Sequence, residues 1–333
     1  MALRGGAMGE KYVLGVDMGG TKTNIALCNA AGELSRLRRF EYEQNSHKQV
    51  IEEIIRSIQT YLDETAAGAD IAAIGLGLKG HVLNTTGVWD RCITIPDFQA
   101  VALGEIIQSR FGIPTFLDND VHAATLAEKR YGIGKKYDDF IYYNIGTGLS
   151  IGIVSDGRLL RGASNYSGEM GHMTTESDGA PCPCGHFGCL EEASSGGAII
   201  RQVKEGLSRE PNSILREVPE KRLTSAAVFD AAQRGDALAK RVTERALKSI
   251  CLSVVAIINV FNPSAIVFGG GVMRDGYLLP AIRDYAWKYP LRPAAEAIRE
   301  ISISEIGPDI VGALGACCVA MEGIKEQSCV MEV

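Results

Sequence analysis

An internal repeat constrains the fold of this chain more than any other feature of its sequence. Residues 12–34 run as an apolar strand, a polar residue, a glycine-rich turn, a second strand and a reverse turn, and residues 140–160 follow the same plan. The corresponding turns are Asp17-Met18-Gly19-Gly20-Thr21 and Asn144-Ile145-Gly146-Thr147-Gly148. A repeat on this scale predicts two related domains with a cleft between their two glycine turns.

Strand and helix patterns alternate along the rest of the chain. Apolar residues at helical spacing predict helices over 49–66 and 121–132, the second with Gly132 as its C-cap. A long helical stretch is expected over 224–262, followed by a strand that ends in the glycine cluster 269–271. The expected fold class is therefore α/β.

Composition excludes several classes of protein. A chain of 333 residues with a net charge of −6 lacks the basic face that a nucleic-acid partner requires. The most apolar run, residues 249–261, is too short to span a membrane and predicts a buried helix. The start of the sequence has no signal-peptide pattern, and nine cysteines in no secreted framework indicate a reducing, cytoplasmic location.

The first glycine turn, in "VDMGGTKTN", could bind phosphate. Glycines let backbone amides approach phosphate oxygens, although the segment is neither a Walker A loop nor a dinucleotide-binding turn. Asp17 at the end of the strand could hold Mg²⁺, directly or through water. The alternative is a tight hairpin with an Asx-type turn. The turns at 146–148 and 269–271 offer two further places of close approach.

The segment "LDNDVHAATLAE" supplies candidates for acid–base chemistry. Asp118, Asn119 and Asp120 lie where a predicted strand ends and a helix begins, so one of them is expected to cap the helix. The functional alternative makes one carboxylate the general base that accepts a proton from a substrate hydroxyl.

A cysteine-rich loop gives the most specific local signal. Cys182, Cys184 and Cys189 follow His172, and three thiolates with one imidazole make a closed, structural zinc site. His186 is a rival fourth ligand, but it lies so near Cys184 in sequence that reaching the same metal is harder. A loop of free thiols is the alternative.

Together these motifs resemble the ROK family of repressors, open reading frames and sugar kinases. The resemblance rests, in the family's order, on "GVDMGGTKTNIAL", "DNDVHAATLAE", "NIGTGLSIGIV", "GEMGHM", "CPCGHFGCLEE" and "NPSAIVFGGGV". It implies a two-domain actin-like ATPase fold of the duplicated ribonuclease H type. Residues 1–125 with 309–333 would form a smaller domain, and residues 126–308 a larger one.

The resemblance also implies roles for individual residues. Asp120 would be the catalytic base, and the sugar would contact Asn119, Glu169, His172 and Glu191. Zinc would bind His172, Cys182, Cys184 and Cys189. Mg-ATP would bind the residues of the glycine turns and their neighbours: Asp17, Gly19, Gly20, Thr21, Lys22, Gly146, Thr147, Gly148, Gly269, Gly270 and Gly271.

The chain departs from the family pattern at three places near the expected acceptor side. Lys79 stands where proline is usual, "ITIPDFQ" replaces a "PNLPGW"-like stretch, and His122 stands where asparagine is common. Lys79 and His81 could be solvated loop residues or could contact an unusual acceptor. His122 could simply be a packed histidine.

The resulting functional expectation is an ATP-dependent kinase acting on the 6-hydroxyl of a hexose of the glucose, mannose, fructose or allose type, or of an N-acetylhexosamine. One alternative is a kinase for a less usual polyol or aminosugar. Another is a catalytically silent sugar sensor. ATP and a small sugar are the expected partners, without nucleic acid or membrane, and the resemblance implies a homodimer. Because no DNA-binding extension precedes the first strand, the kinase branch of the family is expected.

Overall fold

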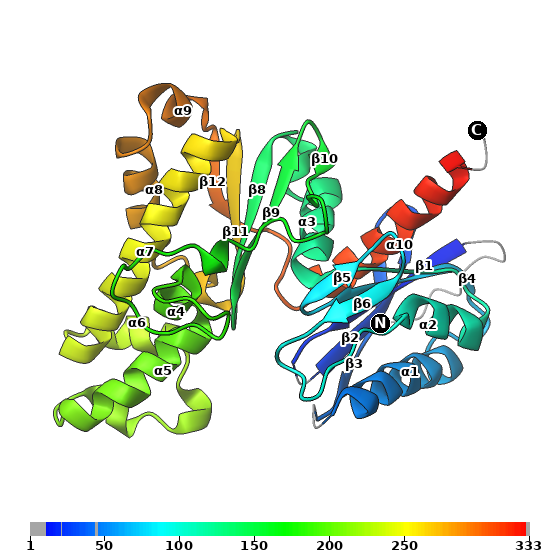
Figure 1. Ribbon diagram of the computed structural model, residues 1–333, viewed down its shortest axis with the longest axis horizontal. Helices are drawn as coiled ribbons and strands as arrows, with labels where there is room; N and C mark the ends of the chain where they lie inside the picture. Colours follow the sequence, from blue (N-terminus) through cyan, green and yellow to red (C-terminus); the bar gives the residue numbers. More distant parts are fainter. Residues whose placement is uncertain (1–10, 21, 44–45, 331–333) are drawn as a thin grey trace, which may run out of the picture. The chain divides into compact units, whose positions relative to one another are not determined.

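The computed structural model describes residues 11–20, 22–43 and 46–330, which form two compact units (Figure 1). The first unit comprises the described residues up to Gly132, the short segment Arg161–Tyr166, and the described residues from Asp309 onward. The second unit comprises Ile133–Leu160 and Ser167–Pro308. The segment 161–166 thus belongs to the first unit, although it lies inside the range expected for the second.

The first unit is built on a five-stranded sheet in the order β3-β2-β1-β4-β7. Strands β1 to β3 pair antiparallel, and β4 and β7 extend the sheet parallel to β1. A separate ladder of β5 and β6 follows β4 in the chain. The bounds are β1 Lys11–Met18, β2 Lys22–Asn29, β3 Leu34–Glu41, β4 Asp70–Leu78, β5 His81–Leu83, β6 Val88–Arg91 and β7 Thr115–Asn119.

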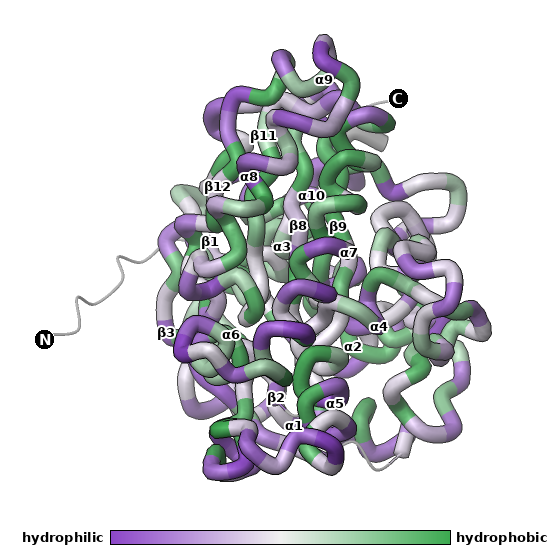
Figure 2. The backbone as a smooth tube through the Cα atoms, turned by 90° about the vertical axis from the view of Figure 1, so that its left-hand side faces the viewer, coloured by the Kyte–Doolittle hydropathy of each residue, from purple (hydrophilic) through white to green (hydrophobic). Residues whose placement is uncertain are grey.

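Helices cover both faces of this first sheet. Apolar side chains of α1 (His47–Glu64) and α2 (Leu103–Phe111) pack against Leu14 and Val16 of β1 in one hydrophobic core. On the other face, α10 (Val311–Val330) crosses β1 and β4 beside α3 (Asp120–Tyr131). Much of α10 is coloured as apolar in Figure 2, as its buried position requires.

Two paired glycines let α10 lie close to the sheet. Gly15 of β1 and Gly75 of β4 are register partners. A Cβ atom at Gly15 would overlap the carbonyl oxygen of Ala313, and one at Gly75 would overlap that of Ala316. The glycines of these strands are therefore needed for the close approach of a helix backbone.

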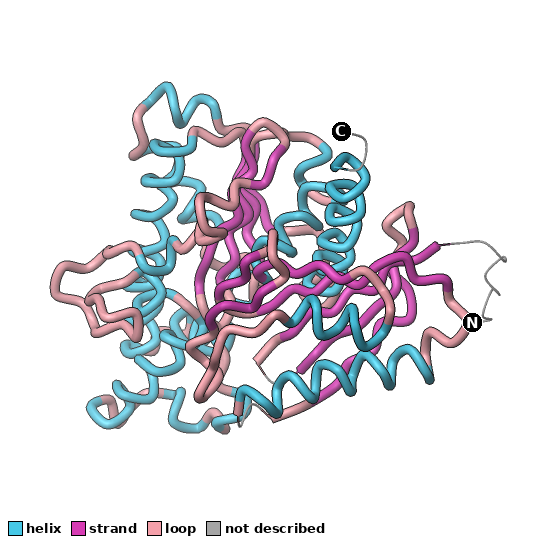
Figure 3. The backbone as a smooth tube through the Cα atoms, turned by 45° about the vertical axis from the view of Figure 1, so that its right-hand side comes forward, coloured by secondary structure: helices cyan, strands magenta, loops and turns pink. Residues whose placement is uncertain are grey.

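The second unit repeats the sheet of the first. Its strand order is β10-β9-β8-β11-β12, with the same antiparallel hairpins followed by two parallel strands. Figure 3 shows strands gathered beside helices in both units. The expected repeat and the α/β fold class are confirmed. The bounds are β8 Phe140–Ile145, β9 Leu149–Ser155, β10 Arg158–Leu159, β11 Ala265–Gly269 and β12 Glu300–Ile303.

Helices α5 to α8 pack on the second sheet around a core that includes Tyr143, Ile151 and Phe268. The stretch expected to be one long helix over 224–262 is two helices. Gly235, with φ of 97°, interrupts the helical conformation between them, and the Asp236 side chain caps the second helix. The bounds are α4 Leu190–Ser194, α5 Gly196–Gly206, α6 Ser225–Gln233, α7 Ala237–Phe261, α8 Leu279–Lys288 and α9 Arg292–Ala297.

Glycine residues mark the ends of two helices in the first unit, and the cap predicted at Gly132 is confirmed. Gly112 ends α2 in the left-handed conformation, with φ of 69°, and Gly132 is the C-cap of α3. Residues 249–261, expected as a buried helix, are the second half of α7, but only one side of it is buried, and Leu252, Val260 and Phe261 are exposed. Within the described part of the chain, no helix has the length and apolar character needed to cross a membrane.

Candidate functional site

The first glycine turn joins β1 to β2 in the first unit. The amide of Gly19 donates to the carbonyl of Lys22 at 2.9 Å, and the hydroxyl of Tyr42 donates to the carbonyl of Gly19 at 2.6 Å. These bonds fix the backbone at Gly19. Thr21, which the sequence places in the same site, lies outside the described residues.

Asp17 is half-buried at the end of β1 and faces the start of α10. Its Oδ2 accepts a hydrogen bond from Asn24 Nδ2 at 3.1 Å. Gly312 leaves room for the carboxylate, because a Cβ there would overlap it. Burial raises the pKa of the Asp17 carboxyl above its ordinary value, although Asn24 and the charge of Lys22 act in the opposite direction. Carboxylate oxygens are ligands that Mg²⁺ prefers, and a divalent cation beside Asp17 would favour its ionised form.

The three polar residues at the end of β7 have different surroundings. Asn119 is the N-cap of α3, and its Oδ1 accepts from the amides of Val121 at 2.8 Å and His122 at 3.2 Å. Its Nδ2 donates to the carbonyl of Gly80 at 3.0 Å. Asp120 is the first helical residue and is half-buried. The capping role therefore falls on Asn119 and leaves Asp120 as the carboxylate near the surface.

Asp118 is buried in a network of hydrogen bonds. It accepts from Arg161 Nε at 2.9 Å and Asn165 Nδ2 at 3.0 Å, and its Oδ1 lies 3.2 Å from Nδ1 of His122. Burial opposes ionisation, yet the His122 hydrogen bond and the Arg161 charge together hold the pKa of Asp118 below its ordinary value. Asp118 is thus an ionised structural residue, and His122 is a packed histidine that helps to hold it.

The turn between β4 and β5 carries Lys79 and His81. His81 is buried and stacks on Tyr166 with ring centroids 3.7 Å apart. Its Nδ1 lies 2.9 Å from Asp90 Oδ2, and its Nε2 lies 2.5 Å from the Ser164 carbonyl oxygen. A solvated His81 is therefore excluded. This histidine joins the segment 161–166 to the β5–β6 ladder.

In the second unit, two glycine turns lie side by side. Gly269, at the end of β11, pairs with Asn144 of β8, and Gly270 adopts φ of 87° against the Ile145 carbonyl. The turn 146–148 is closed by the Gly146 amide, which donates to the Gly148 carbonyl at 2.9 Å. The second and third turns expected to bind ATP are thus neighbours at the carboxyl ends of adjacent strands, where α/β folds commonly bind ligands.

The start of α5 also belongs to this place. The amide of Gly196 donates to the Gly146 carbonyl at 2.8 Å, and that of Gly197 donates to the Thr147 carbonyl at 3.2 Å. A Cβ at either glycine would press on the turn. We did not predict a role for these two glycines from the sequence, although the run "SSGGA" before a helix indicates a close approach of the backbone.

Three residues of the second unit were expected to contact the sugar, namely Glu169, His172 and Glu191. They lie around the short 3₁₀ helix Met170–His172. Nε2 of His172 is 3.8 Å from Oε2 of Glu169. Glu191 lies against Gly171, and its Oε2 accepts from the Leu149 amide at 2.7 Å. Glu191 therefore also links the end of the glycine turn at 146–148 to the segment that carries Glu169 and His172.

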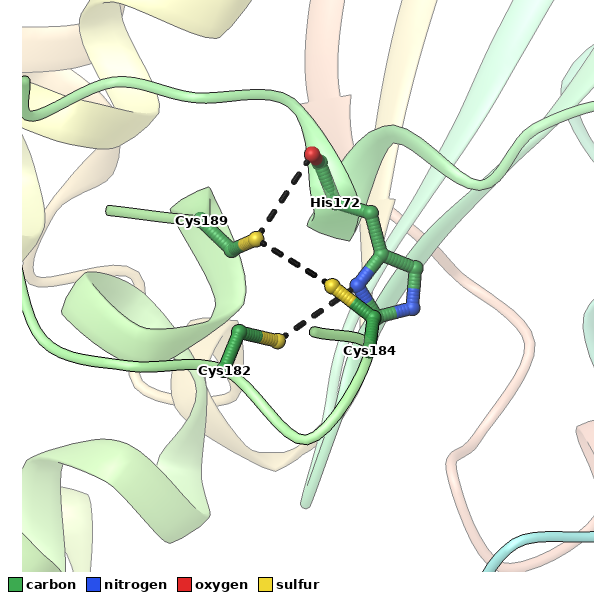
Figure 4. A group of neighbouring side chains, drawn as sticks. All are labelled: His172, Cys182, Cys184 and Cys189. Carbon is green, nitrogen blue, oxygen red and sulfur yellow. Dashed lines mark hydrogen bonds between the residues drawn. The ribbon is translucent and has the colours of Figure 1, made fainter. Parts of the chain in front are cut away.

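The cysteine-rich loop brings four possible metal ligands together (Figure 4). The ligand atoms of His172, Cys182, Cys184 and Cys189 all lie within 4.8 Å of one another. Cys182 Sγ is 3.7 Å from His172 Nδ1, and Cys184 Sγ is 3.6 Å from Cys189 Sγ. Zinc–sulfur bonds of about 2.3 Å in a tetrahedron place sulfurs about 3.8 Å apart, so this group fits zinc.

Two further details bear on the metal. His186 is exposed and outside the four-residue group, so the rival to His172 is not favoured. Nδ1 of His172 faces the sulfur of Cys182 (Figure 4). The other ring nitrogen, Nε2, is the one that lies 3.8 Å from Oε2 of Glu169. Burial raises the pKa of the Cys189 thiol to about 12, so zinc would have to displace a proton there.

The geometry and order of these motifs agree with a comparison to protein families. The model of the ROK family matches residues 13–322. The chain belongs to the ROK family. A glucokinase of Thermotoga maritima is 32% identical over 322 residues, which make up 95% of this chain and 99% of that protein.

Solved structures of ROK proteins share the fold. A ROK family glucokinase from Streptomyces griseus, in complex with glucose and AMPPNP, has a TM-score of 0.78 at 26% identity, covering 94% of this chain and all (100%) of that one. A ROK family transcriptional regulator, a homolog of the E. coli MLC protein, has a TM-score of 0.80 at 28% identity, covering 95% and 81%. The expected actin-like ATPase fold is confirmed, and the family includes kinases and regulators.

Proposed function

We propose that this ROK protein is an ATP-dependent sugar kinase that transfers the γ-phosphoryl group of Mg-ATP to the 6-hydroxyl of a hexose or N-acetylhexosamine. One observation carries the proposal: the first glycine turn and Asp120 follow parallel strands of a single sheet at the same edge. A phosphate-binding turn and a carboxylate at that edge are the two elements that phosphoryl transfer to an alcohol needs.

Asp120 would be the general base. Its carboxylate would accept the proton of the sugar hydroxyl while the hydroxyl oxygen bonds to the γ-phosphorus and the bond to ADP breaks. Asn119, not Asp120, is the N-cap of α3, and the half-buried Asp120 carboxylate accepts from the Val121 amide at 3.0 Å through Oδ1. The assignment is supported by the position of Asp120 directly after β7, at the same edge of the sheet as the first glycine turn. Asp17 would hold Mg²⁺, whose charge would offset the charge on the phosphates. Gly19, Gly20, Thr21 and Lys22 would contact the phosphate chain.

The second unit would contribute two groups of residues. The turns Gly146, Thr147, Gly148 and Gly269, Gly270, Gly271 would bind phosphate and adenosine. Glu169, His172 and Glu191, together with Asn119 of the first unit, would bind sugar hydroxyls. A zinc ion would have all four of its tetrahedral positions occupied by protein ligands, so it would act as a structural ion. These ligands would be His172, Cys182, Cys184 and Cys189. The imidazole would keep Nε2 for the sugar, as its orientation allows.

A silent sugar sensor is the second candidate, because a ROK regulator is among the similar structures. A kinase for a less usual polyol or aminosugar is the third, motivated by Lys79 and the altered acceptor segments. One experiment separates the three. ADP release is measured over a panel of hexoses, N-acetylhexosamines, polyols and aminosugars, and the phosphorylated carbon is identified by NMR. Turnover with a hexose or N-acetylhexosamine at carbon 6 is expected, and sugar binding without ADP release would favour the sensor.

A further inference from the structure

Lys79 follows β4, the strand that lies between β1 and β7 in the first sheet, and the sequence alone did not predict this position. In the parallel part of the first sheet, Met18 of β1 pairs with Leu78 of β4, and Leu78 pairs with Asn119 of β7. The next residue on each strand is Gly19, Lys79 and Asp120, respectively. Neighbouring strands are about 4.8 Å apart, so Lys79 follows the central strand, between the phosphate turn and the carboxylate of Asp120.

The Lys79 side chain points toward the phosphate turn. Its Nζ lies 3.5 Å from the place that a Cβ atom on Gly20 would occupy. Within the described part of the chain, Lys79 forms no ion pair. An ammonium group without a carboxylate partner, next to a turn that approaches phosphates, is a ready binding group for an anion.

The backbone that carries Lys79 is held on both sides. Its carbonyl accepts from Nε1 of the buried Trp89 at 2.8 Å. The carbonyl of the next residue, Gly80, accepts from Asn119 Nδ2 at 3.0 Å. Gly80 has φ of 83° and no room for a Cβ against the Arg91 carbonyl, so the turn requires glycine there. The base of the Lys79 side chain is therefore fixed, which lowers the entropic cost of ligand binding.

We propose that Lys79 binds the γ-phosphate of ATP and stabilises the charge on the phosphoryl group during its transfer. This inference rests on the proposed kinase function. The γ-phosphate is the part of ATP that must pass from the phosphate turn to an acceptor beside Asp120, and Lys79 follows the strand between them. A hexose or N-acetylhexosamine is uncharged and gives little reason for an ammonium group.

The test compares nucleotides that differ by one phosphate. Lys79→Met keeps the length of the side chain and removes the charge, whereas Lys79→Arg keeps the charge. Binding of ADP and of a non-hydrolysable ATP analogue is measured by calorimetry, and kcat by sugar-dependent ADP release. In Lys79→Met we expect affinity for the ATP analogue to fall about tenfold or more, with ADP affinity nearly unchanged. The kcat value should fall as well, and Lys79→Arg should recover part of both.

Lys48→Met is the control, since Lys48 is an exposed lysine of α1 in the same unit. If Lys79→Met does not fold, Lys79→Gln gives the same comparison. Equal losses for ADP and the ATP analogue, or a change confined to the sugar KM, would overturn the assignment to the γ-phosphate. Failure of the proposed function looks different: the unaltered protein would then release no ADP with any sugar, while the two nucleotide affinities would still report on Lys79.

Discussion

Arg161 donates from Nε to Oδ2 of Asp118 at 2.9 Å, which joins the segment 161–166 to the end of strand β7. A second guanidinium nitrogen donates to Glu322 of α10 at 3.1 Å. The Asp118 side chain is 1% exposed and that of Arg161 is 22% exposed, so the pair is largely removed from water. This contact lies directly beside Asn119 and Asp120 and holds the strand end from which they project.

Replacing Asp118 by asparagine should destabilise the first unit. Removing the Asp118 charge leaves the largely buried Arg161 with Glu322 as its remaining carboxylate partner, so we expect the free energy of unfolding at pH 7 to fall by about 2–4 kcal/mol. The pKa of Asp118 is lowered from 3.8 in the folded protein. The contribution of Asp118 to the free energy of unfolding is therefore complete above about pH 4. It is lost as the pH falls through the lowered pKa that Asp118 has in the folded protein.

Urea denaturation of both proteins between pH 7 and pH 3 measures this difference. The gap between their unfolding free energies should be constant down to about pH 4 and shrink below it. Asp230→Asn, at an exposed ion pair with Arg234, is the control and should cause no measurable change. A gap that widens toward acid would contradict the assignment of Asp118 as an ionised residue.

Asp120→Asn tests the proposed general base. The amide keeps the size and most hydrogen bonds of the side chain but cannot accept the proton. We expect kcat to fall about a hundredfold or more with sugar affinity nearly intact. Steady-state ADP release and sugar calorimetry measure the two quantities, and Asp63→Asn, at an exposed carboxylate of α1, is the control. A kcat near that of the unaltered protein would exclude Asp120 as the base.

Cys184→Ser should lose zinc, because a hydroxyl replaces one of the thiolates of the four-ligand group. Without the metal, the loop that carries His172 loses its anchor, so we expect a lower Tm and a higher sugar KM with little change in ATP affinity. Metal content by mass spectrometry and thermal denaturation are the measurements. His186→Gln, in the same loop but outside the group, should retain zinc, and a metal-free Cys184→Ser protein with full activity would refute the structural role.

Gly75→Ala should destabilise the first unit through α10. The added Cβ would overlap the Ala316 carbonyl, so the helix must move away from the sheet. Overpacking of this kind costs about 1–3 kcal/mol, which chemical denaturation can measure. Gly271→Ala is the control for stability, because nothing lies within 4 Å of the Cβ it adds. Equal stability of the two variants would show that α10 adapts without cost.

Features encoded by neighbouring residues could be predicted from the sequence. The repeat of 12–34 in 140–160 follows from strand and turn patterns that need no distant partner, and both sheets have the same strand order. The preference for His172 over His186 as a zinc ligand was also predicted from the sequence, although spacing alone does not decide it, because Cys182 and Cys184 are equally close in sequence and both belong to the group. The glycine cap at Gly132 was equally local.

Features that depend on distant partners could not be predicted. Asp118 and Arg161 are separated by 43 positions, and no periodicity links them. The same is true of His81, whose contacts with Ser164 and Tyr166 decide that it is buried. The long helical stretch expected over 224–262 is helical but interrupted, because apolar periodicity on both sides of Gly235 did not reveal its positive φ. In each case tertiary packing decided between conformations that the local sequence allowed.

The position of α10 has a consequence for the order of events during synthesis. The strands of the first sheet leave the ribosome first, yet the helix that covers one of its faces is the last described element of the chain. The second unit does not include the segment 161–166, and all of its residues have been made once Pro308 has been added. Domains tend to fold as units as the chain emerges. The unit that is begun second can therefore finish folding first, because the sheet of the first unit is not covered on this face until α10 has been made.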